Sequence, residues 1–205
     1  MELNVPRSRL GSRAVHPIEV ESYAIMRSRL DTSDLPPLTR AVLERVVHTT
    51  ADPSWAGDLV CDEETLVAGR AALRDGAPLV TDVRMVAAGI TAVPTVVALD
   101  LAGDPTDGST RSAAGIKAAV QLCPEGAVWV IGNAPTALAE LVRCAADGLL
   151  STPLVVGMPV GFVGAVAAKS ALRAAGLPAV SNRSERGGAA VAAAAVNALL
   201  YSEDA

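Results

Sequence analysis

His48 is the residue of this chain best placed for acid–base chemistry. It follows an apolar stripe of helical spacing and stands shortly before Pro53, so it falls in the last turn of a predicted helix. The negative end of a helix dipole stabilises an imidazolium there, which suits a proton donor at neutral pH. The alternative is a structural histidine that caps the last carbonyl groups. His16, in a charged stretch, is expected at the surface.

Hydroxyls, amides and glycines gather in four segments that lead from a predicted strand into a predicted helix. These segments are 81–91, 104–112, 132–138 and 157–164. A helix N-terminus exposes N–H groups that bind anions, and Arg111 could add a bidentate contact to a carboxylate. The candidate ligand contacts are Thr91, Arg111, Ser112, Asn133, Gly157, Gly161 and Phe162. For any single segment, ordinary capping of the helix is the competing interpretation.

The composition narrows the function classes. The net charge is −5 and aromatic residues make up 2%, so the chain lacks the positive, base-stacking surface of nucleic-acid binders. Residues 157–164 read G-x-x-x-G-x-x-G rather than a dinucleotide-binding motif, which disfavours nucleotides. Three scattered cysteines and two histidines predict no metal site. Buried free thiols in a reducing compartment are the expectation.

The length favours one domain. We expect residues 1–205 to form a single domain, with residues 1–15 as a disordered N-terminus. The basic N-terminus is not followed by an apolar run, so no signal peptide is expected. Residues 148–168 carry no charge, but prolines and glycines interrupt them, and we interpret them as a strand, a turn and a helix. A cytoplasmic protein that does not bind membranes is therefore expected.

Helices are predicted in the first third of the chain. The first spans Pro17–Leu30. The second begins near Asp34, a plausible N-cap, and ends at 48–53. The third spans about Asp62–Asp75, with acidic residues at its start and Gly76 at its end.

From residue 78 onward, short apolar runs alternate with helical stretches. The predicted strands are Leu79–Thr81, Thr95–Leu99, Ala127–Ile131, Leu154–Val156 and Ala179–Ser181. The predicted helices are Asp82–Gly89, Ser109–Leu122, Pro135–Asp147, Val163–Ala175 and Gly187–Leu200. The alternation predicts a three-layer α/β domain whose parallel sheet has about five strands, with the ligand outside their carboxyl ends. The last helix is apolar on every face, which predicts burial in the domain or at a subunit interface.

Seven blocks, in this order, resemble the precorrin-8X methylmutase family of cobalamin biosynthesis. They are Glu21–Met26, Arg45–Asp52, Asp82–Thr91, Thr110–Ala114, Gly132–Leu138, Gly157–Ala165, and Gly187-Gly188 with Asn197-Ala-Leu. The similarity runs from about His16 to Leu200. Each block alone is a weak signal, but all seven in this order are specific.

The resemblance implies a flavodoxin-like fold and a homodimer with active sites at the subunit interface. It implies an isomerase that moves a methyl group from C11 to C12 of precorrin-8X or cobalt-precorrin-8, giving hydrogenobyrinate or cobyrinate. Neither cofactor nor metal is needed. His48 matches the family's proton donor or acceptor, Ser22 and Arg45 match substrate contacts, and Gly188 lies in the last block. A flat apolar macrocycle rimmed with carboxylates suits an apolar slot surrounded by anion sites.

The chain departs from the family in the segment that usually reads G-R-x-G-G-S. Here residues 184–189 read Ser-Glu-Arg-Gly-Gly-Ala, and an acid near the first block is replaced by Arg29. Glu185 in place of a basic residue would weaken binding of a polyanion unless Arg183 or Arg186 compensates. A non-catalytic corrinoid carrier on the same fold therefore stays open as an alternative, and a nucleotide-dependent α/β enzyme is the third hypothesis.

Overall fold

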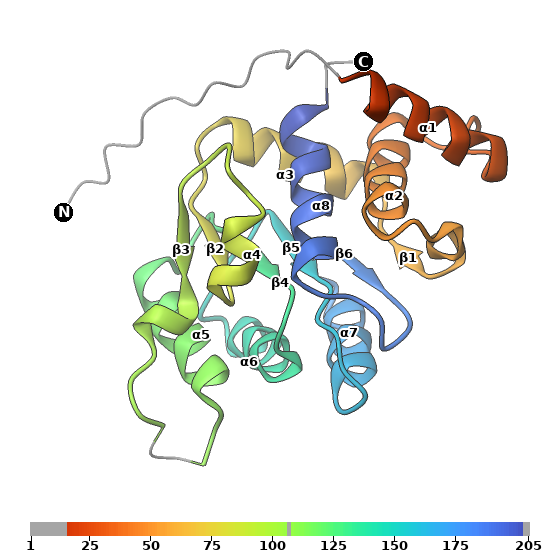
Figure 1. Cartoon of the computed structure of the whole chain (residues 1–205). Helices are drawn as coiled ribbons and strands as arrows, with labels where there is room; N and C mark the ends of the chain where they lie inside the picture. The colour runs from red at the N-terminus through yellow and green to blue at the C-terminus, as the bar shows by residue number, and fades with distance from the viewer. Residues whose placement is uncertain (1–15, 106–107, 203–205) are drawn as a thin grey trace.

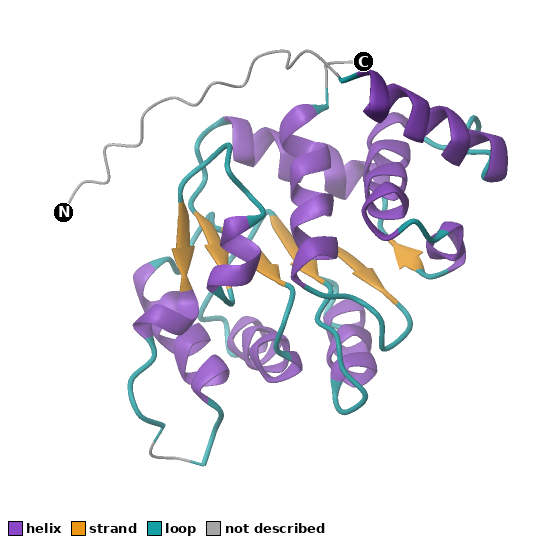
Figure 2. Cartoon of the chain, in the orientation of Figure 1, coloured by secondary structure: helices purple, strands orange, loops and turns teal. Residues whose placement is uncertain are grey.

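The structure, a computed structural model that describes residues 16–105 and 108–202, is built on a six-stranded sheet. Its strands are β1 (Leu59–Val60), β2 (Leu79–Thr81), β3 (Thr95–Val97), β4 (Val128–Ile131), β5 (Leu154–Gly157) and β6 (Ala179–Asn182). They lie in the order β1-β6-β5-β4-β2-β3 (Figures 1 and 2). The five predicted strands are confirmed, except that β3 ends at Val97, because residues 98–101 form a 3-10 helix. The two-residue β1 is additional, and it pairs with the distant β6 in antiparallel fashion.

The five parallel strands have the flavodoxin-like order. In chain order among themselves they lie 2-1-3-4-5, and every neighbouring pair is parallel. The strand order reverses between β2 and β4. The carboxyl ends of these two strands therefore flank the point where such folds bind ligands.

Helices cover both faces of the sheet (Figure 1). One face carries α5 (Arg111–Leu122), α6 (Pro135–Ala146) and α7 (Ala165–Ala174), and the other carries α8 (Ala189–Tyr201) with α2 (Pro37–Thr50), α3 (Glu63–Arg74) and α4 (Arg84–Ala88). Helix α1 (Pro17–Arg29) packs outside α2, and short 3-10 helices η1 (Pro53–Gly57) and η2 (Ala98–Leu101) join the elements. Successive side chains of β4 enter opposite cores: Val128 and Val130 face the α8 layer, whereas Trp129 and Ile131 face the other.

The start of α2 differs from the prediction. Asp34 does not cap this helix, which begins at Pro37 after Pro36 and has no side-chain cap of its own. Glu63, at the start of α3, accepts the backbone N–H groups of Leu38 and Thr39 at 2.9 and 2.8 Å instead. This cap comes from 25 residues further along the chain, so local spacing could not reveal it. Asp62, one of the acidic residues expected at the start of α3, is the N-cap of that helix and accepts a hydrogen bond from the backbone N–H of Thr65.

Helix α8 forms the centre of its layer. Most of its residues are buried, which confirms the predicted burial within the fold. Small side chains on α8 allow close approach of the backbone around it: a Cβ on Gly132 would lie 2.9 Å from Ala192 Cβ, and one on Gly89 would lie 2.7 Å from Ala193 Cβ. The Ala-rich sequence of α8 thus sets how closely this layer packs on the sheet.

Four further expectations concern segments or residue types spread over the chain. Residues 148–168 form β5, a loop and the first turn of α7, as predicted. Among residues 16–105 and 108–202, no helix has the length and hydropathy needed to span a membrane. The three cysteines are free, but only Cys144 is buried, while Cys61 and Cys123 are half-buried. The predicted disordered segment 1–15 lies outside the described residues.

Candidate active site

Helices α1 and α2 bring His48 and Ser22 together. Ser22 Oγ lies 3.0 Å from His48 Nδ1. His48 stands in the last turn of α2, as predicted, and Ala51 ends the helix in a left-handed conformation at φ 53°. Both side chains are half-buried, so the imidazole is partly accessible. A histidine whose Nδ1 is held by a hydroxyl has a defined ring orientation, which proton transfer at Nε2 requires.

Tyr23 packs flat against the His48 ring. The ring centroids lie 4.9 Å apart and the planes differ by 11°. The guanidinium carbons of Arg27 and Arg45 lie 5.5 and 5.9 Å from the centroid of the Tyr23 ring. Burial raises the pKa of Tyr23 and the nearby Arg45 opposes this effect, so the phenol is neutral at pH 7. Tyr23 therefore fixes the plane of the imidazole, while Ser22 fixes its rotation.

Ion pairs hold α1 and α2 in the relative position that brings Ser22 to His48. Arg45 Nη1 pairs with Glu19 Oε1 at 3.2 Å. Arg27 donates two hydrogen bonds to Glu44, at 2.9 and 2.6 Å, and Thr32 donates a third. Burial raises the pKa of Glu44, but the bonds from Arg27 and Thr32 outweigh it, and the pKa lies below its usual value. The carboxylate is therefore ionised at neutral pH and fastens α1 to α2.

Arg111 and Ser112 form the first turn of α5, at the carboxyl edge of the sheet. Arg111 is exposed and Ser112 half-buried. The cap of α5 is Thr110, which accepts from Ala113 and lies 2.8 Å, Oγ1 to Oγ1, from Thr136 in the first turn of α6. The N-termini of α5 and α6 are thus joined side by side, and their positive dipole ends face the same edge.

The switch point between β2 and β4 holds a carboxylate of the chain itself. Asp82 is buried and accepts hydrogen bonds from the backbone N–H groups of Gly132, Asn133 and Ala134, at 3.1, 2.8 and 2.9 Å. Burial raises the pKa of Asp82 and these donors oppose the rise. The three N–H groups therefore bind an internal anion rather than a ligand. The half-buried side chain of Asn133 stays a candidate contact.

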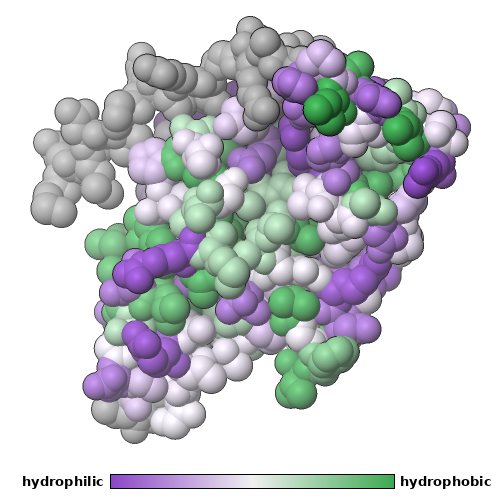
Figure 3. All heavy atoms as spheres, viewed as in Figure 1, coloured by the Kyte–Doolittle hydropathy of each residue, from purple (hydrophilic) through white to green (hydrophobic). Residues whose placement is uncertain are grey.

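The loop after β5 carries the most exposed apolar side chains of the described chain. Phe162 is 98% exposed and Val163 is 88% exposed. Figure 3 shows hydrophobic spheres projecting at the lower edge of the molecule, over this loop. Gly161 is half-buried, whereas Gly157 is buried in β5, where a Cβ would come within 2.5 Å of Leu172. Gly157 thus serves packing and does not reach the surface.

The predicted contacts fall into two groups. Ser22, Arg45 and His48 lie on α1 and α2, whereas the N-terminus of α5 lies at the opposite end of the molecule (Figure 1). The expected position of Thr91 at the carboxyl edge is wrong: the residue leads into β3, which is parallel to β2, so it lies at the amino edge. The structure therefore does not gather all candidate residues within one chain.

Comparison with known proteins decides the family. Residues 17–202 match the family described as precorrin-8X methylmutase. The chain belongs to this methylmutase family. It is 36% identical to the cobalt-precorrin-8 methylmutase of Synechocystis, over 90% of the chain and 94% of that protein. It is 39% identical to the precorrin-8X methylmutase of Pseudomonas aeruginosa, over 87% and 91%.

A solved structure of the methylmutase family has the same fold. The precorrin-8X methylmutase of Thermus thermophilus superposes with a TM-score of 0.79 at 32% identity, covering 89% of this chain and 93% of that one. Members of the methylmutase family are isomerases of cobalamin biosynthesis. The resemblance found in the sequence blocks is therefore confirmed at the level of family, fold and enzyme class.

The segment that contains Glu185 is expected to bind a polyanion only if Arg183 or Arg186 compensates for the lost basic side chain. Arg186 does not compensate for the lost basic side chain, because it pairs with Asp52 and Asp58 and lies over the Trp55 ring, 4.6 Å from its centroid. The Glu185 side chain is exposed, and its backbone oxygen accepts a hydrogen bond from Gly161. Of the basic residues in this segment, the exposed Arg183 is the one that a ligand could reach.

Sequence reasoning missed several residues of this candidate site. Tyr23 and Glu44 support His48 and the α1–α2 register, and Asp82 organises the switch point. For Tyr23 a signal existed in the sequence. Glu19, Tyr23 and Arg27 are spaced four residues apart, which places their side chains on one face of α1. For Asp82 the sequence held no comparable signal, because an acidic residue between a strand and a helix is equally typical of a helix N-cap.

Proposed function

We propose that the protein moves a methyl group from C11 to C12 of precorrin-8X or its cobalt counterpart, with hydrogenobyrinate or cobyrinate as product. The observation that carries this proposal is the Ser22–His48 pair at 3.0 Å in a chain of the methylmutase family. The family relationship supports the reaction type, and the pair supplies the proton-transfer group that it needs.

His48 exchanges the proton of the reaction. When the Ser22 hydroxyl donates to Nδ1, the neutral imidazole carries its proton on Nε2 and presents it to the macrocycle. A proton added to the conjugated ring system makes it electron-poor and favours migration of the methyl group from C11 to C12. The proton then returns to His48, so the rearrangement balances without a cofactor, a metal or an external methyl donor.

A homodimer completes the site. The α1–α2 group of Ser22, Arg45 and His48 lies far from the contacts at the carboxyl edge within one chain (Figure 1). Exposed apolar side chains adjoin each group: Ile18 and Ile25 on α1 are 70% and 47% exposed, and the loop after β5 carries Phe162. Burial of these surfaces between two copies would place His48 of one protomer beside the carboxyl-edge loops of the other.

The substrate's carboxylates bind around the rim of this combined site. Arg111, Ser112 and the Asn133 side chain offer donors at the carboxyl edge, and Arg45 offers a guanidinium beside His48. Further contacts come from Gly161, Phe162 and Gly188 at the interface. The protein acts as a single domain in the cytoplasm.

A titration with hydrogenobyrinate, followed in the visible spectrum, tests the function. Tight binding with one site per chain, together with turnover of precorrin-8X, is expected. Stoichiometric binding without turnover would instead identify a corrinoid carrier. Absence of both binding and turnover at micromolar concentrations would refute a corrin ligand.

A further inference from the structure

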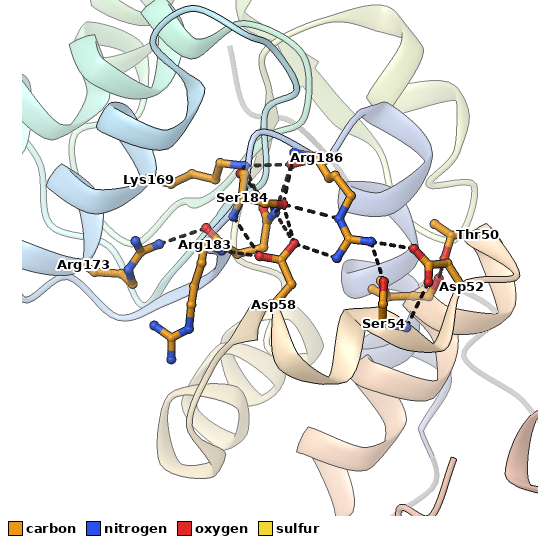
Figure 4. Close-up of polar contacts among 11 residues, drawn as sticks. Thr50, Asp52, Ser54, Asp58, Lys169, Arg173, Arg183, Ser184 and Arg186 are labelled. Atoms are coloured by element: carbon orange, nitrogen blue, oxygen red, sulfur yellow. Dashed lines mark hydrogen bonds and ion pairs between the residues drawn. The ribbon is translucent and has the colours of Figure 1, made fainter. Parts of the chain in front are cut away.

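A buried polar network lies beneath the segment that joins β6 to α8 (Figure 4). Asp58, 7% exposed, accepts hydrogen bonds from the backbone N–H groups of Arg183 and Ser184, at 2.9 and 2.7 Å. It also accepts from the Ser184 hydroxyl at 2.6 Å and from the side chains of Asn182 and Arg186 at 3.0 Å. Burial raises the pKa of Asp58, but these donors outweigh it, and its pKa lies well below the usual range.

Lys169 holds the same segment from the other side. Its ammonium group is fully buried and donates to Asn182 Oδ1 at 2.9 Å, to the Arg186 carbonyl at 2.7 Å and to the Ser184 carbonyl. All three N–H groups of the ammonium thus have acceptors. Burial lowers its pKa to about 8, so the group is charged at pH 7. A buried ammonium is costly, and it fixes the segment only because each of its donors is matched.

The segment held in this way is bonded directly to the loop after β5. Gly161 donates its N–H to the Glu185 carbonyl at 3.1 Å, and Gly188 donates its N–H to the Met158 carbonyl at 2.9 Å. Gly161 and Gly188 adopt φ values of 156° and 123°, which side-chain-bearing residues rarely reach. Glycine backbone is intrinsically mobile, so these two residues need external restraint to occupy one position.

We propose that Lys169 and Asp58 are positioning residues for the active site, which hold segment 183–188 so that it fixes Gly161 and Gly188 in place. This proposal rests on the proposed function only in that Gly161 and Gly188 are proposed substrate contacts. Neither Lys169 nor Asp58 touches the substrate, since both lie beneath the segment. The role explains why a lysine without surface exposure is found among apolar residues of α7.

Hydrogen-exchange mass spectrometry of the full chain tests the proposal. Lys169→Met keeps the length of the side chain and removes its three donors. Leu141→Ala, on the buried face of α6, is the matched destabilising control. In Lys169→Met we expect peptides covering 158–164 and 184–190 to exchange at least tenfold faster than in wild type. In Leu141→Ala these two peptides should exchange at the wild-type rate. A milder variant, Ser184→Ala, removes only one donor to Asp58 and should accelerate the same peptides to a smaller extent.

The spectral titration with hydrogenobyrinate is run on the same variants. Binding at least tenfold weaker in Lys169→Met, but within twofold of wild type in Leu141→Ala, supports positioning of the ligand contacts. Unchanged exchange rates in both peptides of Lys169→Met overturn the proposal. If Lys169→Met does not fold, unchanged exchange rates in both peptides of Ser184→Ala overturn it instead. Wild type that fails to bind hydrogenobyrinate refutes the proposed function instead, and the exchange rates still test the positioning.

Discussion

Ser22 and His48 lie on different helices, 26 residues apart in sequence, and their side chains meet at 3.0 Å. The bond occupies Nδ1 and leaves Nε2 for the proton exchange that we propose for His48. Tyr23 restricts the same ring through stacking. The geometry of the proposed catalytic pair thus depends on how α1 packs against α2.

His48→Asn should lower the turnover of precorrin-8X by a factor of about 10²–10⁴, because the group that exchanges the proton is lost. Binding of hydrogenobyrinate should stay within a few-fold of wild type. Turnover is measured from the change in visible absorption. His16→Ala is the control: His16 is exposed and only caps α1, so activity should be retained. Wild-type turnover in His48→Asn would eliminate the catalytic role.

Ser22→Ala should reduce kcat about tenfold, because Nδ1 loses the partner that fixes the tautomer and the rotation of the ring. KM should change little. Ser28→Ala, which removes a hydroxyl bonded only to the Ile25 carbonyl on the exposed side of α1, is the matched control. Equal kcat values for the two variants would show that the Ser22–His48 bond has no part in catalysis.

Subunit complementation tests the shared site. His48→Asn and Arg111→Ala are each expected to be inactive as homodimers. Each proposed site takes His48 from one chain and Arg111 from the other. In a heterodimer of the two variants, one site would therefore carry both substitutions and the other site would carry neither. After random mixing, half of the dimers are heterodimers with one intact site, so about one quarter of wild-type activity should return. No recovery, although exchange of subunits is confirmed by mass spectrometry, would place each site within one chain.

Asp82→Asn should destabilise the fold by about 2 kcal/mol or more, because an amide cannot accept all the backbone N–H groups that the carboxylate binds. Urea unfolding followed by circular dichroism measures the change. Asp100→Asn, in a surface ion pair with Arg84, should cost less than about 1 kcal/mol. Similar losses in the two variants would contradict the structural role given to Asp82.

Asp58 should contribute to the stability of the protein above its unfolded pKa of 3.8, because its folded pKa is lower. As the pH falls below 3.8, the unfolded chain takes up a proton that the folded state excludes, and stability is lost. The advantage of wild type over Asp58→Asn should therefore shrink by about 1 kcal/mol between pH 5 and pH 3. Urea titrations at each pH measure it, and a constant difference would show that the carboxylate pKa is not depressed.

Much of the fold could be predicted because its signals are local. Five apolar runs became the five parallel strands, and their alternation with helices determined the layers. The features that could not be predicted depend on residues distant in sequence. Glu63 caps α2 from the start of α3, and β1 forms only because β6 lies beside it.

The site could be predicted in part. The spacing placed His48 at a helix end, and the resemblance selected Ser22 and Arg45, which the structure brings together on α1 and α2. The direction of each side chain was not accessible from spacing. Arg186 turns inward to Asp58 instead of toward a ligand, and the N–H groups before α6 bind Asp82.

The position of α8 also constrains how the chain folds during synthesis. This helix fills the centre of one layer, between the sheet and α2, yet it follows every other described element along the chain. The ribosome must pass residue 201 before this core can close, and until then the apolar faces of α2 and β4 stay uncovered. The nascent protein is therefore expected to need chaperone protection late in synthesis, even though its parallel strands are already complete.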